Sequence, residues 1–109
     1  MPEALAIFST CSNEQEANQL ARTLVSEKLA ACVNVIRGIE SVYRWQGKVE
    51  TATECLLLIK TVPERFDALT ARLEALHSYE VPEVIAIPIA GGSEKYLAWL
   101  RAQVQGGQA

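Results

Sequence analysis

The most constraining feature of the chain is a pair of strand-like runs, residues 32–45 and 48–61, that flank a Gln46-Gly47 turn. The first run is rich in β-branched and aromatic residues, and the second alternates in character from one residue to the next. A strand of about fourteen residues spans roughly 46 Å at ~3.3 Å per residue. A globular chain of this size has a diameter of roughly 34 Å, so the hairpin must bend or project from its own domain. Gly38 is the expected site of a bend or bulge.

The second run of this hairpin changes along its length. Its outer half has one polar face, formed by Lys48, Glu50 and Glu54, whereas its inner half, residues 55–59, is apolar on both faces. A strand that is apolar on both faces needs cover on both. Helices of the same chain can cover one face, and we expect neighbouring subunits to cover the other and to pair with the projecting arm. A strongly curved hairpin in a monomer is the alternative.

Hydrophobic periodicity predicts a strand and a helix before the hairpin. The short apolar run at residues 4–10 indicates a buried strand. Ser12 then begins a capping box of sequence Ser-Asn-Glu-Gln, which favours a helix start. Apolar residues recur at helical spacing from Ala17 to Leu29, and the helix is expected to end within residues 28–31.

A second helix and a fourth strand are predicted after the hairpin. Pro63 followed by Glu64 suits a helix N-terminus, and the apolar stripe that comes next ends at His77. Residues 83–89 are predicted to form the fourth strand. Pro88 has no amide hydrogen to donate, so this end of the strand should lie at an edge or a bulge of the sheet.

The last segment adds one helix. Ser93 is the expected N-cap of a helix over residues 94–104, and residues 105–109 are expected to form a loose tail. The first six predicted elements match the ferredoxin-like split βαβ arrangement, βαββαβ. We therefore predict one α+β domain over residues 1–109, with a four-stranded antiparallel sheet and two helices on one face. The opposite face would be bare in a monomer, which is a second reason to expect self-association.

Composition narrows the class of protein. The 109 residues suit one domain with one core, and half of them are hydrophobic, so the chain is not disordered. The net charge is −3 and no basic patch stands out, which argues against nucleic acid as the main partner. The apolar runs are too short to span a membrane, and residues 1–9 lack the features of a signal peptide. We therefore expect a cytoplasmic protein without a membrane partner.

The three cysteines, Cys11, Cys32 and Cys55, make an odd count without a CxxC pair. This pattern fits reduced thiols in a cytosolic protein better than a disulfide framework. Cys32 and Cys55 lie within strand patterns, where a cysteine usually serves as a small core hydrophobe. Cys11 differs, because it lies where the first strand is predicted to end.

The sequence offers little for catalysis. His77 is the only histidine, and neither a GxSxG motif nor a glycine-rich phosphate loop is present. A pair of Cys11 and His77 would suit nucleophilic catalysis, and their separation in sequence neither supports nor excludes it. Glu80 and Glu83 flank Pro82, where paired glutamates are more often loop polarity than catalytic carboxylates. We therefore expect no enzymatic activity.

His77 is open to two interpretations. An imidazole at a helix C-terminus commonly interacts with the last carbonyl groups, favoured by the helix dipole. Together with a thiolate, it also suits copper or zinc as a ligand. One histidine and three scattered cysteines cannot close a metal site within a monomer. A site at His77 would therefore be shared between subunits, or be weak and completed by carboxylate and water.

Four segments together resemble the CutA divalent-cation-tolerance proteins. They are EKLAACVN at residues 27–34, SVYRWQGKVE at 41–50, LLIKT at 57–61 and HSYEVPE at 77–83, and the resemblance covers about residues 4–100. It implies a ferredoxin-like subunit in a cytoplasmic homotrimer whose hairpin arms complete sheets between subunits. Members of the family are linked to tolerance of copper and other divalent cations, and no enzymatic reaction is attached to the family.

The resemblance also implies candidate ligands for Cu²⁺ or another divalent cation. His77 occupies the place of the family's histidine, and Leu76 precedes it where some members carry a second one. The family's cysteine near the end of the first strand corresponds to Ser9 here. Cys11, two residues later on the same face of an extended strand, is the candidate substitute. With Glu83 as an oxygen donor, we expect weak metal binding through His77, Cys11 and Glu83 near subunit interfaces.

An alternative function follows from the similarity of such trimers to PII-type signalling proteins, which bind small ligands in clefts between subunits. In this alternative a small anionic molecule is the ligand, and metal binding is incidental. The candidate cleft residues are Lys48, Lys60, Tyr79, Glu80 and Trp45.

Overall fold

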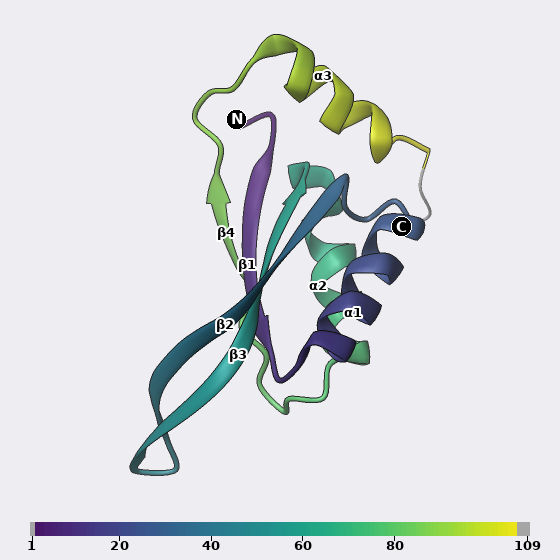
Figure 1. Cartoon of the computed structure of the whole chain (residues 1–109). Helices are drawn as coiled ribbons and strands as arrows, with labels where there is room; N and C mark the ends of the chain where they lie inside the picture. Colours follow the sequence, from purple (N-terminus) through teal and green to yellow (C-terminus); the bar gives the residue numbers. More distant parts are fainter. Residues whose placement is uncertain (1, 107–109) are drawn as a thin grey trace.

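The computed structural model describes residues 2–106, which form a four-stranded antiparallel sheet with two helices on one face (Figure 1). The strands are β1 (Leu5–Cys11), β2 (Cys32–Trp45), β3 (Lys48–Thr61) and β4 (Ile85–Pro88). The helices are α1 (Glu14–Ser26), the short 3-10 helix η1 (Pro63–Arg65), α2 (Phe66–Leu76) and α3 (Glu94–Gln103). The sheet order β2-β3-β1-β4 confirms the predicted ferredoxin-like fold with an additional C-terminal helix. Of the predicted tail, residues 107–109 lie outside the described residues.

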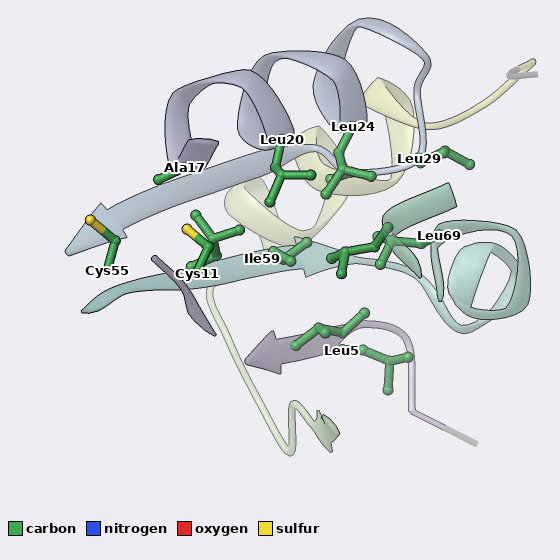
Figure 2. Close-up of a cluster of buried hydrophobic side chains, with 13 residues drawn as sticks. Leu5, Cys11, Ala17, Leu20, Leu24, Leu29, Cys55, Ile59 and Leu69 are labelled. Carbon is green, nitrogen blue, oxygen red and sulfur yellow. The ribbon is translucent and has the colours of Figure 1, made fainter. Parts of the chain in front are cut away.

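One face of the sheet, here called the covered face, packs against α1 and α2. Side chains alternate along a strand, so every second residue of β1 and β3 points to this face. Ile7, Leu57 and Ile59 are completely buried there, as are Leu20 and Leu24 of α1. Figure 2 shows these layers meeting, with Leu69 of α2 on the same core. The chain's own helices therefore cover this face. Full burial of each such side chain contributes roughly 1.5–3 kcal/mol to the stability of the fold.

The opposite face, here called the open face, is formed by the intervening residues. Strand register places Phe8 beside Leu58 and Ile85, and Ala6 beside Ile87. Ile85 is 52% exposed and Ile87 48% exposed. The third helix, α3, lies across one end of the sheet instead of on this face (Figure 1). The bare face predicted from the order of elements is therefore present in the protomer.

The β2-β3 hairpin gives the molecule its longest dimension, 44 Å. Pairing shifts register between Ile36 and Ile39, and Gly38 has a φ of +68°, so the predicted bulge is confirmed. Gln46 and Gly47 have φ values of +50° and +82°, which matches the type I′ turn favoured in two-residue hairpin loops. Residues 39–53, here called the arm, extend beyond the two helices (Figure 1).

The ends of α1 differ from the prediction. Asn13, and not Ser12, is the N-cap, because its side chain accepts a 2.8 Å hydrogen bond from the backbone N–H of Glu16. The helix ends at Ser26, before the predicted residues 28–31, and Lys28 has a left-handed φ of +60° that a continuing helix excludes.

Two predictions about the strands were also wrong in detail. The fourth strand comprises Ile85–Pro88 and not residues 83–89, because only these four residues pair with β1. It does lie at the edge of the sheet, as Pro88 predicted. Glu54, predicted on the polar face of the arm, is only 8% exposed, because Tyr79 packs against it and donates a hydrogen bond to its carboxylate.

Candidate functional site

Residues 77–84 connect α2 to β4, and His77 anchors this segment to the end of β1. The imidazole Nε2 lies 2.8 Å from the carbonyl oxygen of Thr10, and Nδ1 accepts a 3.0 Å hydrogen bond from the backbone N–H of Tyr79. A carbonyl can only accept and an amide can only donate. The ring is therefore the neutral tautomer with its hydrogen on Nε2. Its side chain is fully buried and both nitrogens are engaged, so His77 is a structural residue in the protomer.

Glu16 of α1 holds the same segment from the other side. Its carboxylate accepts hydrogen bonds from the N–H and Oγ of Ser78 at 2.8 and 3.0 Å, and from the N–H and Oγ of Ser12 at 3.3 and 3.0 Å. Burial favours a higher pKa for Glu16, but the bonds from Ser78 and Ser12 outweigh it and lower the pKa below its ordinary value. Glu16 also lies 3.8 Å from His77 Nδ1, but that nitrogen accepts a hydrogen bond, so the contact is not an ion pair.

A hollow of about 720 Å³ lies between this segment and the arm. Three carboxylates, Glu54, Glu80 and Glu83, contribute to its walls together with aromatic rings. No lysine or arginine from residues 2–106 lines it. The hollow is thus acidic and partly aromatic. Its full lining is Thr10, Ser41, Val42, Tyr43, Trp45, Glu54, Ser78, Tyr79, Glu80, Val81 and Glu83.

Tyr79 and Glu54 form a hydrogen-bonded pair in the wall of the hollow. The Tyr79 hydroxyl donates to Glu54 Oε2 at 2.6 Å. Burial, and then this bond to a carboxylate, raise the pKa of Tyr79 above its ordinary value, so the phenol keeps its hydrogen. The pair connects the loop after α2 to the base of the arm, and it leaves a carboxylate in the wall of the hollow.

The residues predicted to line a ligand cleft separate into two groups. Trp45, Tyr79 and Glu80 lie around the hollow, whereas Lys48 and Lys60 are not among its lining residues. Lys48 is exposed at the tip of the arm. Lys60 lies toward the other end of β3, where its ammonium group donates to the side-chain oxygen of Asn34.

The predicted metal ligands occupy different surroundings. Cys11 is the last residue of β1 and shares the covered face with Ser9, and both are fully buried. Burial, with help from Glu16 and Cys55, raises the pKa of the Cys11 thiol to about 11. Glu83 lines the hollow. Within residues 2–106, no three His, Cys, Asp or Glu side chains gather as a metal-binding group, so one chain does not assemble these ligands into a site.

Two residues of this region were not found by sequence analysis. Glu54 was assigned to a solvated face, and no sequence signal connects it to Tyr79. Glu16 did carry a signal, because it is the third helical residue after Asn13, where a capping-box glutamate reaches back toward the N-cap. Because the N-cap was predicted one residue early, at Ser12, this role of Glu16 was not predicted.

Comparison with known proteins decides the family. The family model described as "CutA1 divalent ion tolerance protein" matches residues 5–103. The chain belongs to the CutA1 family. This CutA1 family member is 53% identical over 98 residues to "Protein CutA 1, chloroplastic" of Oryza sativa subsp. japonica, with 90% of the chain and 55% of the relative covered. These matches confirm the resemblance inferred from the four sequence segments.

A bacterial relative and a solved structure agree with this assignment. The CutA1 family member is 50% identical over 95 residues to "Divalent-cation tolerance protein CutA" of Thermus thermophilus, with 87% and 92% of the two chains covered. A crystal structure of CutA1 from Oryza sativa resembles it with a TM-score of 0.93 at 49% identity, and 97% of each chain is covered.

The names of these relatives describe tolerance of divalent cations, and none of the three is an enzyme name. The chain spans about half the length of the plant relatives, 55% of the one from rice and 54% of one from Arabidopsis thaliana. Both plant relatives are named chloroplastic, whereas the relative from Thermus thermophilus is bacterial. No helix within residues 2–106 is both long and apolar enough to cross a membrane.

Proposed function

We propose that this chain contributes to divalent-cation tolerance by binding a metal ion weakly, without an enzymatic step, in the hollow beside the arm. The observation that supports it is the presence of Glu54, Glu80 and Glu83 around a space that no described lysine or arginine lines. Carboxylates draw a cation into such a space and supply oxygen ligands, while water completes its shell. Binding is weak because no three of the described ligands are pre-assembled.

Cu²⁺ is the ion of choice for testing this proposal, because it stands at the top of the affinity order for divalent metals. Glu83 is the predicted ligand that lines the hollow, and His77 and Cys11 stay predicted ligands as well. His77 can bind only after the N–H of Tyr79 leaves Nδ1, and Cys11 only after its thiol loses a strongly held hydrogen. Both requirements lower the affinity, since metal ligands must be deprotonated and free.

Calorimetric titration with Cu²⁺ tests the hollow. Glu83→Gln removes one carboxylate charge, whose attraction for a doubly charged ion at about 4 Å in water is worth ~2 kcal/mol, or roughly a thirtyfold weaker affinity. Glu64→Gln, an exposed position on η1, is the matched control and should bind like the wild type. Equal affinity of Glu83→Gln and wild type would remove the hollow from the proposal. Unchanged binding by His77→Ala and Cys11→Ser would remove only those two ligands.

The proposed active form is a homotrimer. Support comes from the exposed Ile85 and Ile87 of the open face and from an arm that extends beyond its own helices. The number three follows from the family resemblance. Light scattering should give three times the 11.9 kDa of one chain. A single-chain mass at micromolar concentration contradicts this part of the proposal.

The alternative of a small anionic ligand gains no support from the protomer. The carboxylates around the hollow repel an anion, and Lys48 and Lys60 lie elsewhere. A panel of anionic metabolites in a thermal-shift assay provides the test. Stabilisation by one of them, following RT ln(1 + [L]/Kd), would favour the PII-like alternative over the cation site.

We place the proposed function in the cytoplasm. Cys11, Cys32 and Cys55 are all free, which suits a reducing compartment. Cell fractionation with immunoblotting should recover the protein with a cytosolic marker. Recovery with a periplasmic or organellar marker instead would contradict the assignment.

A further inference from the structure

The hollow beside the arm is larger than a metal ion needs. Its volume of about 720 Å³ falls within the range of about 300–1,000 Å³ that small-molecule sites occupy. A divalent ion with six water molecules fills only about 180 Å³, at ~30 Å³ for each water. Most of the hollow therefore stays available to a larger cation.

One wall of the hollow runs along the arm. Ser41, Tyr43 and Trp45 are alternate residues of β2, so their side chains point to the same face of the strand, and all three line the hollow. From Ser41 to Trp45 the strand spans roughly 13 Å at ~3.3 Å per residue. Tyr43 and Trp45 are 44% and 43% exposed, so both rings are accessible. This wall suits an elongated molecule that can lie against aromatic rings.

Glu54 supplies a hydrogen-bond acceptor that is not in use. The residue is only 8% exposed and lines the hollow. Its Oε2 accepts the hydroxyl hydrogen of Tyr79, whereas its Oε1 receives no hydrogen bond from residues 2–106. Within that range the fully enclosed side-chain atoms without a partner belong to Ser9 and Thr70, so Oε1 of Glu54 is open to the hollow. A carboxylate oxygen can only accept, and its strongest partner is a charged N–H group.

We propose that the hollow binds an aliphatic diamine with both amino groups protonated. One ammonium group donates to Oε1 of Glu54, and the second faces the exposed carboxylates of Glu80 and Glu83. The carbon chain between them lies against Tyr43 and Trp45, whose rings also attract cations. This inference rests on the proposed cation-binding hollow and adds a class of organic cation to it.

The same features exclude related ligands. A quaternary ammonium ion suits the aromatic rings but has no N–H group to donate to Glu54. An amino acid carries a carboxylate that the acidic walls repel. A monoamine occupies Glu54 and leaves Glu80 and Glu83 without a positive partner. Two ammonium groups joined by an apolar chain satisfy the whole lining.

Calorimetric titration of the full chain with linear diaminobutane tests the site at low ionic strength, where charges are least screened. Glu54→Gln should weaken binding about tenfold, because a charged acceptor becomes neutral. Trp45→Leu should weaken it about threefold through the loss of the ring. Glu40→Gln, exposed on the arm, and Trp99→Leu, on α3 and 44% exposed, are the matched controls. Neither lines the hollow, and both should bind like wild type.

The ligand can be varied as well as the protein. The fully N-methylated diamine keeps both charges but has no N–H group, so wild type should bind it about tenfold more weakly than diaminobutane. Equal binding of the two ligands, or wild-type affinity in Glu54→Gln, would overturn the inference. Circular dichroism verifies the fold of each variant. The comparison of ligands needs only wild type, so it still decides the question if Glu54→Gln does not fold.

The result is separable from the binding of Cu²⁺ in the same hollow. Trp45→Leu should lose diamine affinity and keep Cu²⁺ affinity, because a ring is not a ligand for Cu²⁺. A wild-type chain that binds Cu²⁺ and gives no heat with diaminobutane would contradict this inference alone. Binding of diaminobutane by a chain that does not bind Cu²⁺ would support this inference and contradict the proposed metal site.

Discussion

On the covered face of the sheet Ile7, Leu57 and Ile59 are completely buried, whereas on the open face Ile85 and Ile87 remain about half exposed. The side chains are equally apolar, so composition does not explain the difference. The connections explain it, because α1 and α2 both pack on the same side of the sheet (Figures 1 and 2). The four strands therefore present two apolar faces, and the chain's own helices cover only one of them.

Placing a charged side chain on the open face is the strongest test of this difference between the two faces. Ile87→Asp should convert an oligomer into single chains, because burying an unpaired carboxylate between subunits costs several kcal/mol. Light scattering measures the mass. Ala71→Asp, an exposed position of α2, is the control and should keep the wild-type mass. An Ile87→Asp variant that also keeps that mass would show that the open face is not covered by other copies.

Shortening one apolar side chain on each face compares how much the two faces contribute to the free energy of unfolding of a single chain. In the Ile87→Asp background, Leu57→Ala should lower the free energy of unfolding by about 2–5 kcal/mol, because it opens a cavity in a packed core. Leu58→Ala, the next residue but on the open face, should cost less. Chemical denaturation gives both values, and equal losses would mean that the two faces are packed alike.

The stability contributed by a buried hydrogen bond on the covered side can be compared with that of an exposed residue on the arm. Thr61 Oγ1 donates to the carbonyl oxygen of Leu29 at 2.6 Å, and Thr61 is fully buried. Thr61→Val leaves that carbonyl unpaired and should cost about 1–3 kcal/mol in the same denaturation experiment. Thr53→Val on the exposed part of the arm should have almost no effect. If both substitutions are neutral, the Thr61 bond does not contribute to stability.

The smallest expected effect concerns Glu16 of α1, which accepts hydrogen bonds from Ser78 in the segment after α2. The pKa of Glu16 is lowered in the folded chain below the ordinary value of 4.5. Its carboxylate therefore stabilises the fold above about pH 4.5, and this contribution disappears as the pH falls through the folded-state pKa. Glu16→Gln should lower Tm near neutral pH and flatten the fall of Tm toward acid. The exposed Glu14→Gln is the control, and a wild-type pH profile for Glu16→Gln would refute the role of Glu16.

Much of the fold could be predicted because its signals are local. The Gln46-Gly47 turn and the Gly38 bulge followed from residue type and spacing, and the order of elements followed from hydrophobic periodicity. The errors occurred where neighbouring residues compete or where a partner sets the limit. Ser12 and Asn13 are both good caps, and the length of β4 depends on how far β1 pairs with it.

The residues of the candidate site could be predicted by type, but the contacts between them could not. Trp45, Tyr79, Glu80 and Glu83 do gather around one hollow. The bond between His77 and Thr10, which uses the Nε2 of the imidazole, joins residues far apart in sequence, and no spacing rule indicates it. The pairing of Cys11 with Cys55 likewise required the register of β1 on β3, which sequence alone left open.

Gly38 has a consequence for the evolution and design of such proteins. Its bulge fixes the point at which the arm leaves the packed part of the sheet, and so separates the register of the arm from that of the core. Two residues added to each strand between Ile39 and Thr53 would extend the arm by roughly 6.6 Å and return every other side chain to its original face. The arm is therefore an adjustable spacer, whose reach can vary in steps of two residues while the core sequence stays the same.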